Sequence, residues 1–322
     1  MNPMRTRPGL TLLELVVVLV ILAILTTVAI EGTSGVIDQG RYDATQRTLQ
    51  NVQNAIIGPT GQHEPDGTPL VTGFVADIGR LPLATADATG ALTLDELWSN
   101  PNGVAAFSFQ PAAAPDTDVL VPCGWRGPYL QLPLGTTQLR DGWGNPLSLL
   151  QADGVTTITT AGTPIPWIRS LGSDDATGGT GYAADTDVIV VGPGINRYQS
   201  ALTVNVTFVT QAGIQTTAPS GGTVSGLTVT HFGPNPANGL ALSLPNTTPT
   251  SGTTTFSFPR PGSTDVITIG PRAVRASCSY SYVPSGSAAG TSPTTVTLKS
   301  PLTWLVLQAG GQAKNVYINL PN

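Results

Sequence analysis

The N-terminal segment decides the fold class, and it reads RTRPGLTLLELVVVLVILAILTTVAI at residues 5–30. Arg5 and Arg7 precede an apolar run that extends from Leu10 to Ile30. As an α-helix, a run of this length reaches about 30 Å, which is the hydrocarbon thickness of a lipid bilayer. Because arginines beside a spanning helix stay on the cytoplasmic side, we expect one transmembrane helix with the rest of the chain outside the cytoplasm.

Glu14 is an acidic residue within this apolar run, and it separates three interpretations. A secretory signal would be removed behind residues 27–29, and a signal anchor would be retained whole. Inserting a carboxylate at the middle of a membrane helix costs about 2.5–3.5 kcal/mol, so Glu14 is expected to have a partner. Neither a secretory signal nor a signal anchor provides one. Cleavage after Gly9 would make Leu10 a charged N-terminus. In a bundle of staggered helices, the amine of one subunit could then meet the carboxylate of its neighbour.

The segment Gly9-Leu10-Thr11-Leu12-Leu13-Glu14 resembles the class III signal of type IV pilins and type II secretion pseudopilins. It departs from that family at Leu10, where phenylalanine is usual. The resemblance implies a leader at residues 1–9, which a prepilin peptidase removes between Gly9 and Leu10 before it methylates the new N-terminus. It also implies that Glu14 is an assembly residue.

The same resemblance implies partners and a location. The subunit would polymerise with copies of itself and with other pseudopilins, in contact with an inner-membrane assembly platform. It would be a single-pass protein of the inner membrane whose C-terminal part lies in the periplasm or outside the cell, and it could form a cell-surface filament. The net charge of −5 provides no basic surface, so we expect no nucleic-acid partner.

The helix is expected to continue beyond the apolar run, so that one membrane and assembly helix covers residues 10–58. Gly58-Pro59 is a helix-ending pair, and no proline lies between Leu10 and Gly58. Apolar residues at helical spacing predict a buried stripe on its second half. These residues are Val36, Ile37, Leu49, Val52, Ile56 and Ile57.

Residues 59–191 are expected to form a separate head with little helical periodicity. Two stretches rich in turn-forming residues stand out, at residues 125–130 (WRGPYL) and 141–147 (DGWGNPL). Their tryptophans are expected in the core. Together with residues 79–82 (GRLP), these stretches also resemble the head of the major pseudopilin of type II secretion, which implies a small antiparallel sheet.

Four aspartates follow within this head, separated by glycines: Asp174, Asp175, Asp185 and Asp187. Such a loop is either a solvated acidic turn or a site for a hard cation, because calcium takes six to eight oxygen ligands. The loop resembles the structural calcium loop of major pseudopilins. That resemblance implies calcium held by Asp174, Asp185, Asp187 and the backbone carbonyl of Leu171, while Asp175 stands where the family has a small residue.

Residues 192–322 show short strand candidates separated by turn residues, which is typical of an antiparallel β-sandwich. Alternation is clear at Leu202, Val204, Val206 and Phe208, and Asp265–Gly270 is another candidate strand. The pattern is similar to an immunoglobulin- or transthyretin-like module. The expected fold class is therefore α+β: a long N-terminal transmembrane helix, a pseudopilin-like head with a small antiparallel sheet, and a C-terminal β-sandwich.

The sequence carries no metalloprotease, P-loop or dinucleotide-binding motif, so we expect no enzyme activity. We expect His63 and His231 in surface loops, where neither reaches a nucleophile, and no catalytic residue is predicted. Cys123 and Cys278 could form one disulfide or remain two buried thiols. Two functions remain: a structural pseudopilin of an export machine, or a pilin-type adhesin whose β domain binds a surface, a sugar or a partner protein.

Overall fold

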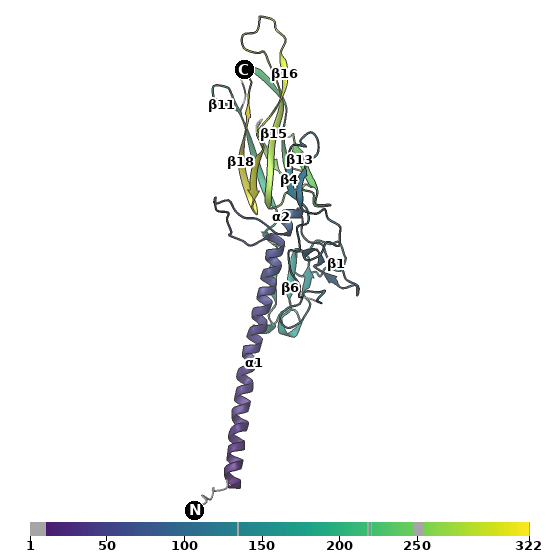
Figure 1. Ribbon diagram of the computed structural model, residues 1–322, viewed down its shortest axis with the longest axis vertical. Coiled ribbons are helices and arrows are strands. Elements are labelled where there is room, and N and C mark those ends of the chain that lie inside the picture. The colour runs from purple at the N-terminus through teal and green to yellow at the C-terminus, as the bar shows by residue number, and fades with distance from the viewer. Residues whose placement is uncertain (1–10, 134, 218, 220, 248–253, 322) are drawn as a thin grey trace, which may run out of the picture.

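We describe a computed structural model of the chain at residues 11–133, 135–217, 219, 221–247 and 254–321, without the side chains of residues 28–34. The predicted leader at residues 1–9, and the cleavage point between Gly9 and Leu10, lie outside these described residues. A long helix carries an elongated body of small sheets, and the C-terminal sheets lie farthest from the N-terminus (Figure 1). The fold class is α+β, as the sequence predicts.

Helix α1 (Leu12–Ile57) is 46 residues long, and its N-terminal half projects from the body as a stalk (Figure 1). Gly58 is the C-cap residue, with a φ of 78°, and its N–H donates to the carbonyl oxygen of Asn54 at 2.9 Å. Glycine accepts this positive φ without strain, so the helix ends where the sequence changes. The last turns of α1 enter the body through one buried face: Leu49, Val52, Ala55, Ile56 and Ile57.

The predicted apolar stripe is wrong at its N-terminal end. Val36 and Ile37 are 73% and 50% exposed, because the first close contacts between the body and α1 fall further along the helix, at Gln39, Tyr42 and Thr45. Helical spacing therefore identified a face of α1. The tertiary structure determines how much of that face is covered within one chain.

The predicted transmembrane segment, Leu10–Ile30, falls only partly within the described residues, because Leu10 and the side chains of residues 28–30 lie outside them. Among the residues that the structure describes, no helix is both long enough and apolar enough to cross a membrane. The large apolar side chains of α1 that are described at this end, from Leu12 to Leu25, are all exposed.

The first part of the body packs around the C-terminal end of α1. Its core combines that helix with α2 (Phe74–Ile78) and the antiparallel sheet β5–β6–β7 (Ser148–Leu150, Trp167–Ser170 and Thr186–Ile189). Shorter elements complete this part: β1 (Thr85–Ala86), β2 (Leu92–Thr93), the 3-10 helices η1 (Asp95–Leu97), η2 (Gly172–Asp174) and η3 (Gly181–Ala183), β3 (Ser108–Pro111), β4 (Leu120–Cys123), β8 (Val191–Gly192) and β9 (Ile195–Asn196).

Two sheets form the C-terminal part, and both contribute to one apolar core. The first contains β10 (Ser200–Val209), β11 (Gln215–Thr216), β14 (Thr255–Phe258) and β18 (Gly310–Asn319). The second contains β12 (Gly222–Pro234), β13 (Ala241–Asn246), β15 (Gly270–Tyr282), β16 (Thr294–Lys299) and β17 (Thr303–Leu307). The predicted alternation in β10 is confirmed, because Leu202, Val204, Val206 and Phe208 are all buried in this core.

One strand pair departs from the expected antiparallel order. Strands β10 and β18 run parallel, with Ser200 opposite Gly310 and Val209 opposite Asn319. Parallel neighbours need a long crossover connection, which the intervening strands supply. Alternating residues reveal which face of a strand is buried, but they carry no information on the direction of the neighbouring strand.

The predicted strand at Asp265–Gly270 is also wrong. This segment has no strand before Gly270, where β15 begins, although Thr268 forms an isolated bridge with Gln199. Ile267 enters the C-terminal core, whereas Ile269 enters the core around α1. In a flat strand, residues two apart point to the same face, so a segment that serves two different cores cannot remain a regular strand.

A third apolar cluster joins the two parts of the body. The hairpin β3–β4 contributes Ala112, Val119, Val121 and Cys123, and the sheet of β12 and β15 contributes Phe232 and Ala273. An ion cluster closes this contact, since Arg275 lies 3.1 Å from Asp116 Oδ1 and 2.7 Å from Asp118 Oδ2. Cys278 lies in the C-terminal core instead, so both cysteines are free and buried.

Candidate functional site

Glu14 forms part of a capping box at the start of α1. Its Oε2 accepts from the N–H of Thr11 at 2.9 Å and from the hydroxyl of Thr11 at 3.0 Å, and the Glu14 N–H donates to that hydroxyl at 3.3 Å. A threonine followed three residues later by glutamate is the sequence signature of this cap. Sequence reasoning considered only the amine of Leu10 as a partner, and Leu10 lies outside the described residues.

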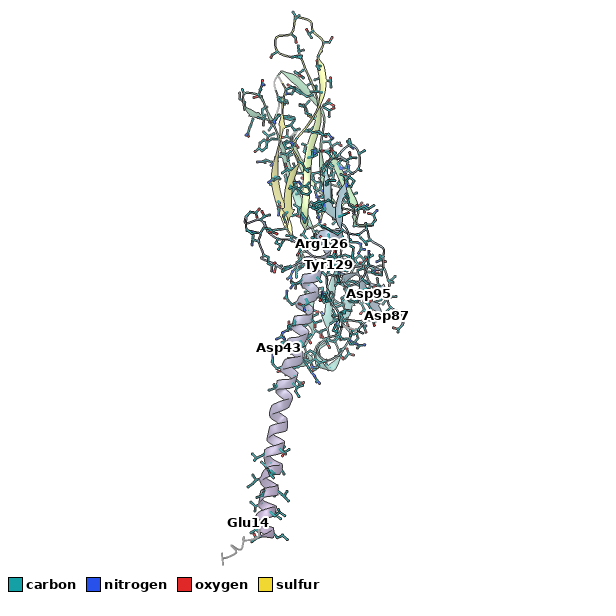
Figure 2. The ribbon with its side chains drawn as sticks, viewed as in Figure 1. Glu14, Asp43, Asp87, Asp95, Arg126 and Tyr129 are labelled. Atoms are coloured by element: carbon teal, nitrogen blue, oxygen red, sulfur yellow. The ribbon has the colours of Figure 1, made fainter. Side chains whose placement is uncertain are left out.

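The stalk around Glu14 exposes apolar side chains in every direction. Leu12, Leu13 and the run from Leu15 to Leu22 are each about half exposed or more. Figure 2 shows Glu14 at the tip of α1, far from the body. A helix that is apolar all round is stable only when lipid or protein covers it. The stalk is therefore a surface that other molecules must cover, and it carries one described carboxylate, that of Glu14.

The segment at residues 141–147 holds α1 against the body. Gly142 N donates to Thr45 Oγ1 at 2.9 Å. The Gly142 Cα lies so close to the carbonyl of Arg41 that a side chain there would collide with the helix backbone. Asp141 organises the turn, because its Oδ1 accepts from the N–H groups of Trp143 and Asn145 at 3.0 and 2.8 Å. This stretch is thus a docking turn for the helix.

The acidic loop follows β6 and is folded tightly upon itself. Gly172 and Gly179 adopt φ values of 71° and 81°, and a Cβ on either would collide with backbone of residues 182–183. Asp175 has a φ of 54°, a conformation that favours glycine and suits the small residue expected there. The glycines therefore let the two ends of the loop pack backbone against backbone.

Two predicted ligands, Asp185 and Asp187, lie together at the entrance to β7. Asp185 Oδ2 accepts from the N–H of Gly178 at 3.1 Å, while its Oδ1 is buried and has no hydrogen-bond partner in the described part of the chain. Asp187 is bound by Arg169, whose Nε lies 2.7 Å from Oδ1 and whose Nη2 lies 3.0 Å from Oδ2. Hydrogen bonding to Asp187 raises the pKa of Arg169.

The other two predicted ligands lie on η2 or beside it. Leu171 immediately precedes η2, and Asp174 is an exposed residue that accepts from the N–H of Ala176 at 3.3 Å. The described residues contain no group of three or more His, Cys, Asp or Glu side chains placed to hold one metal ion. Asp185 Oδ1 has no hydrogen-bond partner among the described residues, whereas both oxygens of Asp187 are bound by Arg169, a contact that sequence reasoning missed.

Asp77 connects α2 to the predicted stretch at residues 125–130. Its Oδ1 accepts from Arg126 Nη2 at 3.0 Å, and its Oδ2 accepts from the Tyr129 hydroxyl at 3.1 Å. Arg126 and Tyr129 lie where α1 meets the body (Figure 2). Burial raises the pKa of Asp77 to about 6, although the charge of Arg126 opposes this rise. Sequence reasoning did not single out Asp77, although an acidic residue within the apolar segment Phe74–Ile78 could have indicated a buried carboxylate with a partner.

Glu96 forms a second buried ionic contact in the body. It accepts from Arg80 Nη2 at 2.6 Å, from the N–H of Leu83 at 2.7 Å and from Asn102 at 2.7 Å. The Nε of Arg80 donates to the carbonyl of Pro236 at 2.9 Å. The residues of the GRLP segment therefore connect the head to the turn between β12 and β13.

His231 is a buried residue of β12, so its predicted place in a surface loop is wrong. The residue is 3% exposed, and neither ring nitrogen has a hydrogen-bond partner among the residues that the structure describes. Burial, together with the nearby charge of Arg272, lowers the pKa of His231 to about 3. Arg272 itself is buried and donates to the carbonyls of Ala76 and Ile269.

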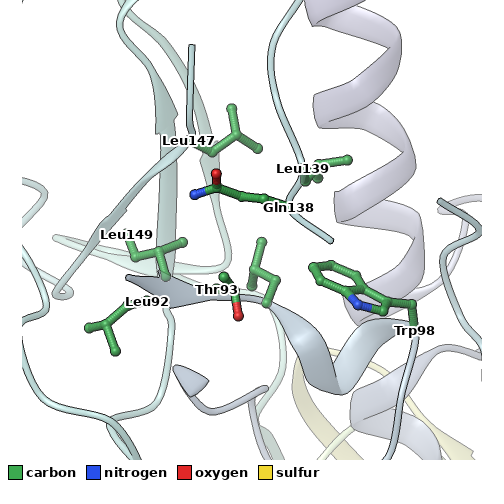
Figure 3. A pocket seen from close by; sticks show the side chains of 8 residues that line it. Leu92, Thr93, Trp98, Gln138, Leu139, Leu147 and Leu149 are labelled. Atoms are coloured by element: carbon green, nitrogen blue, oxygen red, sulfur yellow. The ribbon is translucent and has the colours of Figure 1, made fainter. Parts of the chain in front are cut away.

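The small cavity in Figure 3 offers no binding site of useful size. It has a volume of about 10 Å³, which is room for about one water molecule. Its wall consists of Leu92, Thr93, Leu94, Trp98, Gln138, Leu139, Leu147 and Leu149.

Comparison with known proteins identifies a family match at the N-terminus. Residues 4–30 match a family model described as the prokaryotic N-terminal methylation motif, which is typical of type IV pilin-like proteins and pseudopilins. The N-terminus is of the prepilin type. The matched residues include Gly9, Leu10 and Glu14 but not the body of the protein. No curated protein and no solved structure matches the chain.

Proposed function

We propose that this protein is a structural subunit of a type II secretion-like pseudopilus or of a type IV pilus-like filament. Its leader at residues 1–9 would be removed by a prepilin peptidase between Gly9 and Leu10. One observation supports this most: α1 exposes an apolar stalk with the carboxylate of Glu14 at its tip, within a prepilin-type N-terminus.

Assembly would give the stalk the cover that it lacks in one chain. Before assembly the helix would lie in the inner membrane, and the body would face the periplasm or the cell exterior. In the filament, stalks of neighbouring subunits and of other pseudopilins would bury one another's apolar side chains. Apolar burial contributes about 25 cal/mol per Å², so packing of stalks provides the main attraction.

Glu14 would set the register of neighbouring subunits. Its Oε2 is held by Thr11, and its Oε1 has no hydrogen-bond partner among the described residues. The methylated amine of Leu10 in a neighbouring subunit could therefore approach Oε1. In an apolar environment, an opposite charge at one position stabilises one alignment strongly and leaves every other alignment with an unpaired charge.

The acidic loop would bind calcium as a structural ion. Asp185 Oδ1, Asp174 and the carbonyl of Leu171 would hold it, with Asp187 joining after release from Arg169. When bound, calcium would neutralise these carboxylates and link η2 to the start of β7. Because Asn145 donates to the carbonyl of Gly172 at 2.9 Å, the loop also supports the turn that docks α1.

The C-terminal sheets would form an immunoglobulin- or transthyretin-like β-sandwich. A second function, as a pilin-type adhesin, is favoured by aromatic side chains exposed on these sheets. Trp304 of β17 is 46% exposed and Tyr317 of β18 is 40% exposed. Exposed aromatic side chains are frequent at binding surfaces for sugars and proteins. The two functions differ in whether the sheets contact a target beyond the filament.

Assembly through Glu14 can be tested by filament yield. Glu14→Ala should insert into the membrane normally, because removing a charge makes insertion easier, and should then fail to assemble. Glu64→Ala, which changes an exposed acid in a loop after α1, is the matched control and should assemble normally. Wild-type filament yield from Glu14→Ala would remove the case for the carboxylate.

A further inference from the structure

His231 lines a small cavity in the C-terminal part of the body. The residue is buried, and neither ring nitrogen meets a donor or an acceptor in the described part of the chain. The cavity has a volume of about 10 Å³, which is the space that one water molecule needs. Thr268 and Arg272 line the same cavity, so polar groups from three segments of the chain meet there.

The polar side chains around this cavity are all deeply buried. His231 and Thr268 are each 3% exposed, and Arg272 is 1% exposed. Arg272 Nη1 donates to the carbonyl of Ala76 at 3.0 Å and its Nη2 donates to Thr268 Oγ1 at 2.7 Å, which holds the guanidinium in place. Its Nε has no acceptor among the residues that the structure describes. A fixed donor and an unpartnered imidazole therefore lie at the same cavity.

The cavity in Figure 3 has the same volume but a different wall. Most of its side chains are apolar, and the hydroxyl of Thr93 already donates to Asp95 Oδ1 at 2.6 Å. Apolar cavities remain empty, whereas a buried water needs about two to four polar partners. Volume alone does not distinguish the two cavities, and the unpartnered imidazole of His231 does.

We propose that the cavity beside His231 is a binding site for one ordered water molecule, which links this ring to Arg272. The water accepts from Arg272 Nε–H and donates one hydrogen to a ring nitrogen of neutral His231. Its other hydrogen is directed to Thr268 Oγ1, whose second lone pair is free to accept it. Burying a polar group without a hydrogen bond is costly, so a water held by three polar groups stabilises the folded chain.

The water extends a connection between the two parts of the body. Arg272 binds the carbonyl of Ala76 in α2, which belongs to the first part. His231 lies on the central strand β12, with its ring centre 5.9 Å from that of Phe258 in the C-terminal core. The bridge requires a neutral imidazole, because a protonated ring has two donors and no acceptor.

Gly233 provides a way to remove the water without changing a polar group. It lines the cavity from β12, two residues from His231 and on the same face of the strand. A Cβ at this position would lie 3.2 Å from His231 Cε1 and 3.3 Å from Arg272 Nε. Its φ is not positive, so alanine suits the strand and its methyl group enters the space between the two side chains. Gly311→Ala on β18, where a Cβ meets open space, is the matched control.

Histidine NMR of the full-length protein in detergent tests the proposal. The chain contains two histidines, so a protein labelled only in histidine gives two imidazole signals, and His63→Gln assigns them. Cross-relaxation between water and ring protons detects a water molecule that remains beside the ring, and exposed His63 is the reference for surface hydration. We expect a long-lived water signal at His231 in the wild type and in Gly311→Ala. In Gly233→Ala we expect this signal to be lost and the acceptor ring nitrogen to shift.

The wild type alone can refute the proposal, even if Gly233→Ala does not fold. A His231 ring without long-lived water at neutral pH would mean that the cavity is empty. A water signal retained in Gly233→Ala would place the water elsewhere than between His231 and Arg272, and it would overturn the bridge. A ring signal that moves with chloride concentration would assign the cavity to an anion beside the buried guanidinium instead.

Discussion

The buried histidine of β12 provides the sharpest test of the structure. His231 has neither ring nitrogen bonded and lies beside the buried Arg272, so protonation in the folded state is strongly opposed. We therefore expect His231→Leu to change the dependence of stability on pH. Leucine has a similar volume and no polar atoms, and replacing an unpartnered buried polar group by an apolar one is close to neutral or stabilising.

The magnitude follows from the two pKa values of His231. The folded-state pKa of about 3 lies below the ordinary value of 6.5, so the unfolded chain takes up the proton first. The contribution of the neutral ring to the free energy of unfolding is therefore fully present above pH 6.5. It is lost progressively as pH falls from 6.5 toward 3. Each pH unit in this window costs about 1.4 kcal/mol. Between pH 7 and pH 4, the loss is on the order of 3 kcal/mol.

Asp77 opposes this trend in the wild type. Its pKa is raised to about 6 in the folded protein, so on acidification the folded state binds this proton before the unfolded chain does. Protonated Asp77 therefore contributes to the free energy of unfolding at low pH, and this contribution is lost as pH rises through 6. The wild-type profile between pH 4 and pH 6 is therefore flattened by two opposite contributions. His231→Leu retains Asp77, so the difference between variant and wild type isolates the histidine.

Urea unfolding at pH 7, 5.5 and 4, followed by tryptophan fluorescence of the full-length protein in detergent, measures this difference. The variant should be within about 1 kcal/mol of the wild type at pH 7 and more stable by about 3 kcal/mol at pH 4. His63→Gln, which changes an exposed loop residue, is the control and should follow the wild type. A constant difference between His231→Leu and the wild type across these pH values would refute the buried, neutral ring.

Three further predictions concern processing, the loop and the body. Intact mass of the membrane-extracted protein should match a chain that begins at Leu10, with or without one methyl group, and a start after residue 29 would indicate an ordinary secretory signal. Asp185→Asn should abolish the rise in melting temperature that calcium produces, and an undiminished rise would place the ion elsewhere. Arg275→Met should lower the free energy of unfolding only modestly, because Asp116 keeps its ion pair with Lys299 and Asp118 is largely exposed, and urea unfolding would show whether it does.

The sequence alone predicted the features that depend on local chemistry. An apolar run, the absence of proline and the Gly58-Pro59 pair predict a long helix, and α1 ends at Ile57. Period-two alternation predicts β10 and the face that it buries. These predictions succeed because backbone preference and burial of one face act over a few neighbouring residues.

Contacts between distant segments were decided only by the tertiary structure. Arg169 and Asp187 are 18 residues apart and meet through the register of β6 and β7. His231 is buried because the sheet of β12 is covered on both faces, by the C-terminal core and by the hairpin β3–β4. Asp265–Gly270 has the composition of a strand but is divided between two cores. Register, strand direction and the covering of a face depend on how whole elements pack, and no local pattern of residues encodes them.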